Sequence, residues 1–162
     1  MSLLRPSADR ALDDGRNRLT LDDDLFLRAH RVLGIPVVNQ TVWRFDRPVD
    51  RTQVDRLHGN LARGPLARSI RRTWVPGARD TWVPSSVTAP VSVRADALAP
   101  HEVLGWAEER ASVTLDPASG PTWNLSVAAT TDGGSVLSYL TPHVVCDGGA
   151  HVGALVAAVA HD

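Results

Sequence analysis

Three residues near the end of this 162-residue chain stand at a spacing that could support base catalysis. His143, Asp147 and Gly148 form a His-x-x-x-Asp-Gly pattern. Histidine titrates near neutral pH, so His143 could take a proton from a hydroxyl or amine that attacks a thioester. Asp147 would anchor the turn by pairing with an arginine, and Gly148 would let backbone pass close behind the histidine without a Cβ clash. A surface histidine beside an ordinary Asp-Gly turn gives the same letters, so the setting must decide.

A metal site is the second chemistry that this segment suggests. His143, Asp147 and His151 stand at i, i+4 and i+8, which on one continuous helix could bind zinc. Pro142 just before the pattern and Gly148 within it disfavour a continuous helix. We therefore predict no metal at this segment.

Two other groups could take part in chemistry. Cys146 could act as a nucleophile beside His143, but in a run with valines it is expected to be a small buried hydrophobic residue. Arg68, Arg71 and Arg72 could receive a phosphate of coenzyme A or of a carrier-protein arm. The favoured interpretation of these arginines is a solvated strand edge with one internal salt bridge.

The elements on either side of the pattern place His143 at the end of a strand. A half-buried strand is predicted from Thr122 to Thr130, then a hairpin turn at Asp132-Gly133-Gly134, then a return strand from Val136 to Thr141. From Gly148 onward, small and apolar residues predict a helix. Reactive groups are often held at such strand ends.

Upstream, helices and strands alternate around turn signals. Strands are predicted at Val37 to Phe45 and Val91 to Arg94, with a hairpin from Ser69 to Val83. A helix follows Asp22, Asp23 and Asp24, a second follows an apparent Asp50–Gln53 capping box, and a third starts at Pro100. Their expected buried faces are Leu25, Ala29, Val32 and Leu33; Val54, Leu57 and Leu61; and Val103, Leu104, Ala107 and Ala111. This mixture predicts an α+β fold with a mostly antiparallel sheet.

The composition excludes several classes of protein. Hydrophobic residues make up 43% and charged residues 22%, as in ordinary globular domains, and a net charge of −1 gives no basic field for nucleic acid. We expect no signal peptide and no membrane span. The single cysteine suits a reducing cytoplasm. We expect a loose segment over residues 1–20 and one folded lobe over residues 21–162.

The order of these signals resembles condensation domains of nonribosomal peptide synthetases. The resemblance rests on Leu115-Asp116, Gly120-Pro121 and Leu125, then on the hairpin, the apolar strand and the His143 pattern. Upstream, the signals are Asn39-Gln40, Pro48-x-Asp50, the helix with Leu57 and Leu61, and an arginine-rich strand. Wax ester synthases and polyketide-associated acyltransferases, which are relatives of these domains, fit equally well.

The resemblance implies a fold like that of chloramphenicol acetyltransferase, with two lobes and a tunnel between them. The tunnel would admit an acyl-coenzyme A or phosphopantetheine thioester as substrate, with no tightly bound cofactor. His143 would be the general base or would position the acceptor. Asp147 would be structural and paired with Arg68 or Arg71, and Gly148 would be conformational.

Two departures from the family pattern shape the functional hypothesis. Many members have a doubled histidine, whereas Pro142 stands first here. The chain also stops just after the helix predicted from Gly148 onward, and it resembles the N-terminal lobe of the family alone. We therefore expect that a C-terminal lobe or a second polypeptide, absent from this chain, completes the enzyme. We also expect the isolated chain to have little or no activity. The apolar motif helix is consistent with a face that awaits a partner. The alternative is a non-catalytic module that docks a carrier protein or another enzyme.

Overall fold

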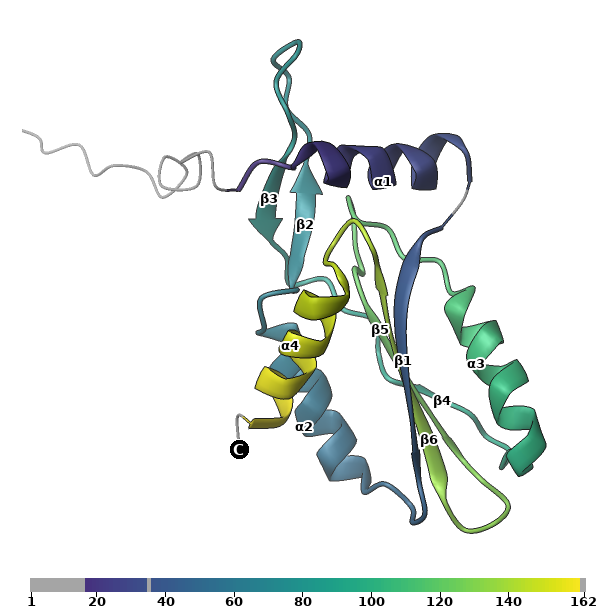
Figure 1. Cartoon of the computed structure of the whole chain (residues 1–162). Coiled ribbons are helices and arrows are strands. Elements are labelled where there is room, and N and C mark those ends of the chain that lie inside the picture. The colour runs from purple at the N-terminus through teal and green to yellow at the C-terminus, as the bar shows by residue number, and fades with distance from the viewer. Residues whose placement is uncertain (1–16, 35, 161–162) are drawn as a thin grey trace, which may run out of the picture.

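A computed structural model describes residues 17–34 and 36–160 of the chain. The described residues form one mixed sheet with a helix or helices on each face, and a separate hairpin (Figure 1). The elements are α1 (Leu21–Val32), β1 (Val38–Phe45), α2 (Arg51–Ala62), β2 (Arg68–Arg71), β3 (Thr81–Pro84), β4 (Ser92–Val93), the 3-10 turn η2 (Pro100–Glu102), α3 (Val103–Ala111), β5 (Asn124–Ala129), β6 (Ser135–Pro142) and α4 (Gly148–Ala160).

The sheet has the strand order β1-β6-β5-β4. β6 pairs antiparallel with both β1 and β5, whereas β4 pairs parallel with β5. β2 and β3 form a second, two-stranded antiparallel sheet. The predicted α+β class, with a mixed and mostly antiparallel sheet, is therefore confirmed.

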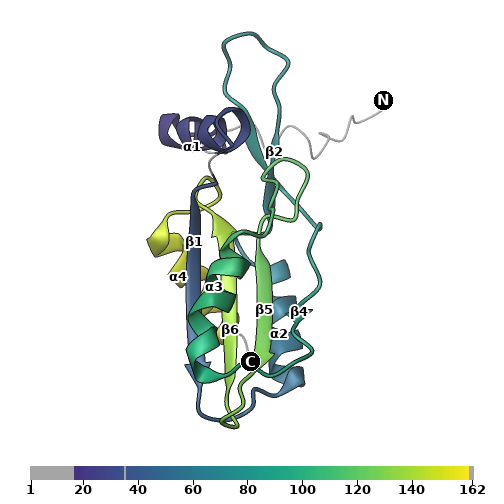
Figure 2. The same cartoon turned by 90° about the vertical axis from the view of Figure 1, so that its right-hand side faces the viewer.

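Helices cover both faces of the sheet around β6. α2 and α4 lie on one face and α3 lies on the other (Figures 1 and 2). Every residue of β6 is buried as a result. The expectation of a half-buried strand at Thr122–Thr130 is wrong for the same reason, because Ser126 and Ala128 are each only 1% exposed on the side opposite Leu125.

Local signals start and end the elements largely as predicted. Thr20 and Asp23 form a capping box that starts α1, and the Asp50 carboxylate caps α2 by accepting from the Thr52 N–H rather than through a reciprocal bond with Gln53. Both hairpins turn through a glycine in the left-handed region, which is the conformation that glycine adopts without steric cost.

Two helices bury different residues from those that the periodicity predicted. In α1, Leu27 is 4% exposed, whereas Leu25 and Val32 are 64% and 77% exposed. In α3, Leu104 is 70% exposed while the neighbouring Trp106 is buried. Apolar spacing identifies candidate faces, but the packing of the other elements decides which face is covered.

Part of the segment expected to be loose is held against the β2–β3 hairpin. Leu19 is 1% exposed, and its N–H donates to the Asp80 carbonyl at 2.9 Å. The Trp82 N–H donates to the Asn17 carbonyl at 2.6 Å. The rest of that prediction, residues 1–16, lies outside the described residues.

Candidate functional site

His143 lies directly after β6, as predicted, and its backbone N–H is hydrogen-bonded while its ring nitrogens are not. Its N–H donates to the Val37 carbonyl at 2.8 Å, which ties the residue to the start of β1. Its half-buried ring packs on Phe26 of α1, with ring centroids 4.2 Å apart and planes inclined by 31°. Within the described residues neither ring nitrogen has a hydrogen-bond partner, so a nitrogen of the neutral ring could accept a proton.

The three residues between His143 and Asp147 anchor the loop in the core. Val144, Val145 and Cys146 are 2%, 0% and 5% exposed. They pack in one cluster with residues of α1, β2, β3 and α4. The cluster also contains Leu19, Leu27, Leu66, Ile70, Trp82 and Ala154. Close packing of these side chains within this chain therefore holds the loop that follows His143.

Arg68 supports this loop through a backbone carbonyl. Its guanidinium donates to the Val145 carbonyl and lies over the Trp82 ring, 4.2 Å from the ring centroid. Desolvation lowers the pKa of Arg68, and the charge of Asp23 opposes that shift. Arg71, on the same strand, is exposed.

Asp147 has a different task from the one expected. Its carboxylate caps α4 by accepting from the Ala150 N–H at 2.7 Å, and its carbonyl accepts from the His151 N–H at 2.9 Å. Among the described residues no ion pair involves Asp147, so Arg68 and Arg71 do not pair with it. The signal was present in the sequence, since Asp before a small-residue helix is a common N-cap.

Gly148 is not placed where a side chain would clash. A Cβ added there would meet no heavy atom within 4 Å, and its φ is not in the left-handed region. The expectation of a close backbone approach behind His143 is therefore wrong. Gly148 is instead an exposed first residue of α4, beside open space.

His151 is a buried histidine behind the loop that the sequence left without a role. It is 2% exposed, and its ring stacks on Tyr139 with centroids 4.6 Å apart. Its Nε2 lies 2.9 Å from Thr41 Oγ1, and its Nδ1 lies 2.8 Å from Thr141 Oγ1. Burial lowers the pKa of His151, which favours the neutral imidazole.

Cys146 is a buried core residue, as expected. Its Sγ lies 3.3 Å from Thr141 Oγ1, and burial raises the pKa of the thiol. A buried thiol with a raised pKa is a poor nucleophile. Zinc ligation by His143, Asp147 and His151 has no support either, because residues 143–147 do not form a helix. The described residues contain no group of three or more His, Cys, Asp or Glu side chains that could hold a metal ion.

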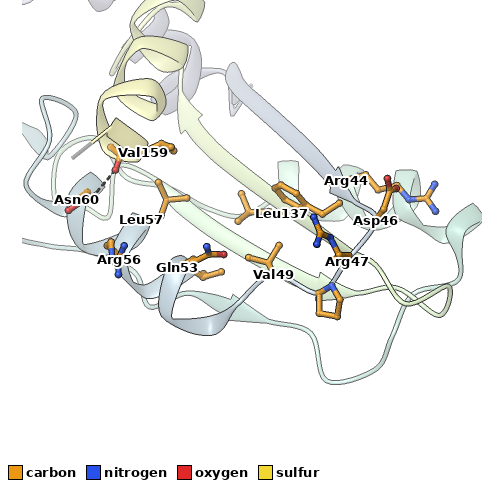
Figure 3. A pocket seen from close by; sticks show the side chains of 14 residues that line it. Arg44, Asp46, Arg47, Val49, Gln53, Arg56, Leu57, Asn60, Leu137 and Val159 are labelled. Carbon is orange, nitrogen blue, oxygen red and sulfur yellow. Dashed lines mark hydrogen bonds between the residues drawn. The ribbon is translucent and has the colours of Figure 1, made fainter. Parts of the chain in front are cut away.

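One pocket of the described surface lies away from His143. It has a volume of about 830 Å³ and is open between the end of β1, α2 and the end of α4 (Figure 3). Its lining includes the buried side chains of Val54 and Leu137 as well as the charged side chains of Arg47 and Asp46. Phe45, which lines this pocket, pairs with the first residue of β6, whereas His143 follows the last. Eight strand residues separate the two, roughly 25 Å.

Comparisons with known proteins identify the fold. No protein-family model and no curated protein matches the sequence. The SgcC5 protein from Streptomyces globisporus has a similar structure, with a TM-score of 0.63 and 17% identity, covering 88% of this chain and 36% of that chain. A structure of the complex of the X-domain and OxyB from teicoplanin biosynthesis matches with a TM-score of 0.69 and 14% identity, covering 98% and 34%.

A third structure concerns condensation domain-mediated chain release from the enacyloxin polyketide synthase, with a TM-score of 0.59 and 23% identity, covering 96% of this chain and 31% of that chain. The protein therefore has the fold found in condensation domains and the X-domain. It spans about a third of the length of these structures. None of the described helices has the length and apolar character needed to cross a bilayer.

Proposed function

We propose that this chain is the histidine-bearing lobe of an acyltransferase, with His143 as general base. The acyl group would pass from a coenzyme A or carrier-protein thioester to an alcohol or amine. The acceptor oxygen or nitrogen would attack the thioester carbonyl as the His143 ring takes its proton. The tetrahedral intermediate would then collapse, breaking the C–S bond, and the imidazolium would return the proton to the leaving thiolate.

The observation that carries this proposal is the contrast at His143 between a fixed backbone and an available ring. The backbone is tied to Val37, and the loop that follows is buried and bonded to Arg68. General base catalysis needs a base whose position is set and whose nitrogen can reach the acceptor proton. The fold of condensation domains and the SgcC5 complex with an aromatic diol fit an alcohol acceptor.

A second lobe or polypeptide would complete the site. Val152, Val156 and Val159 stand at i, i+4 and i+7 on α4 and are 52%, 64% and 64% exposed. Such a stripe on a helix is typical of a face that packs against a partner. Acyl transfer also needs groups that stabilise the oxyanion. We expect the second lobe to supply them, together with the other wall of the substrate channel.

Native mass spectrometry of the purified protein, beside a denatured mass, tests for the second polypeptide. A bound chain of similar or greater size would support a two-chain enzyme. A monomer, or a homodimer that buries α4, would argue against it and favour a fragment or a docking module.

Acyl transfer with His143→Ala tests the base. We expect the completed enzyme to lose turnover by about 10²- to 10⁴-fold in this variant, and the isolated chain to show little or none from the start. His101→Ala is the matched control, because His101 is an exposed histidine on η2. Equal turnover of the two variants would overturn the assignment of His143.

A second candidate function is docking of a partner enzyme or a carrier protein. The similarity to the X-domain, whose structure was solved in a complex with OxyB, favours it. In a binding assay against carrier proteins or candidate partner enzymes, a docking role would survive His143→Ala. An enzymatic role would not survive it in the transfer assay, so the two assays separate the candidates.

A further inference from the structure

A chain of side-chain contacts runs behind the His143 loop and joins four parts of the fold. Thr41 Oγ1 on β1 lies 2.9 Å from His151 Nε2, and His151 Nδ1 lies 2.8 Å from Thr141 Oγ1 at the end of β6. Thr141 Oγ1 lies 3.3 Å from Cys146 Sγ, within the loop. His151 itself belongs to α4, so β1, β6 and α4 meet at one imidazole, and the loop is linked to that imidazole through Thr141.

The contacts can all be hydrogen bonds with a neutral ring. In one arrangement the Thr41 hydroxyl donates to Nε2, the Nδ1–H donates to Thr141 Oγ1, and the Thr141 hydroxyl donates to Cys146 Sγ. The opposite tautomer satisfies the same atoms with every direction reversed. A fully satisfied buried network specifies one arrangement of the parts that it joins, because breaking it leaves buried polar atoms without partners.

We infer that His151 is a positioning residue, which holds the His143 loop against β1 and β6 through Thr41, Thr141 and Cys146. This inference rests on the proposed function, since the position of the loop matters for chemistry only if His143 is the base. His151 does not touch the reacting space, because both of its ring nitrogens face threonines and its ring is stacked on Tyr139. Its effect on His143 would pass through the backbone of residues 142–147.

Amide hydrogen exchange on the full chain tests the inference without any acyl-transfer assay. His151→Phe keeps an aromatic ring against Tyr139 and removes both nitrogens. We expect exchange at the N–H groups of His143 and Val145 to be at least about 10-fold faster in this variant, while the β5–β6 ladder changes less. The His143 Cε1–H resonance, which lies under the Phe26 ring current, should also shift towards the value of a free histidine.

The matched control is His58→Phe. His58 is half-buried, whereas His151 is buried; His58 bonds to the Ala89 carbonyl at 2.7 Å and packs on Trp123 with centroids 5.0 Å apart, and it lies on α2. Its replacement removes a part-buried histidine bond without touching the loop. The loop amides and the His143 resonance should therefore keep their wild-type behaviour relative to the ladder.

Two gentler variants keep the test decisive if His151→Phe folds poorly. Thr41→Val keeps the β-branched shape on β1 and removes one contact, so a smaller acceleration confined to the loop is expected. His151→Asn can keep the bond to Thr141 and should restore part of the protection. Uniform acceleration of all amides, or an unchanged loop in both His151→Phe and Thr41→Val, would overturn the inference. Either result is independent of whether the chain transfers acyl groups.

Discussion

Replacing Arg68 should destabilise the loop between His143 and Asp147 and lower the free energy of unfolding, whereas replacing Asp147 should not. Arg68→Met keeps most of the side-chain volume and removes the donor to the Val145 carbonyl. Val145 is 0% exposed, so its carbonyl would lose its partner where water does not readily replace it. An unsatisfied buried acceptor costs about 1–3 kcal/mol.

Loss of the cation–π contact adds to the cost of the unsatisfied carbonyl in Arg68→Met. Removal of the half-buried positive charge lowers that cost. The guanidinium lies 4.2 Å from the Trp82 ring centroid, a contact of about 0.5–2 kcal/mol. Desolvation already lowers the pKa of Arg68, so removing the charge recovers part of that cost. We expect a net loss of about 2 kcal/mol in the free energy of unfolding, or a melting temperature lower by roughly 4–8 °C for a chain of this size.

Urea denaturation followed by tryptophan fluorescence measures this difference. Arg71→Met is the matched control, because Arg71 is exposed on the same strand and should cost less than about 1 kcal/mol. Asp147→Asn should cost less than about 0.5 kcal/mol, since asparagine caps helices as well as aspartate does.

The double variant of Arg68→Met and Asp147→Asn decides between the two arrangements of the loop. If Arg68 bonds to the Val145 carbonyl, the two effects should add to within about 0.5 kcal/mol. A coupling energy above about 1 kcal/mol would refute the reasoning and restore the arginine–aspartate pair. So would an Arg68→Met variant as stable as Arg71→Met.

Three further outcomes follow from the buried groups and the glycines. Burial lowers the pKa of His151 from its usual value of 6.5, so the unfolded chain binds this proton before the folded chain does as the pH falls. The free energy of unfolding should therefore decline below about pH 6.5, and it should decline less steeply in His151→Phe. Denaturation at a series of pH values measures this. Cys146, with its raised pKa and 5% exposure, should react with an aromatic disulfide reagent at pH 8 at least about 100-fold more slowly than an unstructured peptide thiol. Gly134→Ala should lower the free energy of unfolding by about 1–3 kcal/mol or more, because its Cβ would lie 2.3 Å from the Phe45 carbonyl oxygen. Gly148→Ala should leave that free energy unchanged or raise it by up to about 1 kcal/mol, because its Cβ would meet no heavy atom within 4 Å. Denaturation of both variants checks this.

Much of the fold follows from local signals in the sequence. Strand alternation and glycine turns predict the β5–β6 hairpin, and the motif was correctly placed between a strand and a helix. Periodicity failed where tertiary packing decides, as in α1, where Leu27 is buried and Leu25 is not. A helix with apolar residues on more than one side offers several faces, and only its neighbours select one.

Only those features of the site that depend on residues close together in the sequence could be predicted. The strand-end position of His143 followed from residues near it in the sequence, and the N-cap role of Asp147 could have followed in the same way. The contact between Thr41 and His151 could not, because these residues are 110 positions apart. It depends on the register of β1 against β6, which no local pattern encodes.

The surface beside His143 and the start of α4 is where a partner would act under the proposed function. The backbone of His143 is hydrogen-bonded and the loop after it is buried, whereas its ring nitrogens have no partner among the described residues and Gly148 at the start of α4 is exposed. Val152 follows Gly148 by four residues on α4, about 6 Å along the helix axis. In the proposed two-lobe enzyme, a partner that covers the exposed valines would therefore also lie close to the start of α4, which directly follows the loop after His143. Under the proposed function, association would bring the groups of the partner towards the end of the His143 pattern, because Gly148 is both the last residue of that pattern and the first residue of α4.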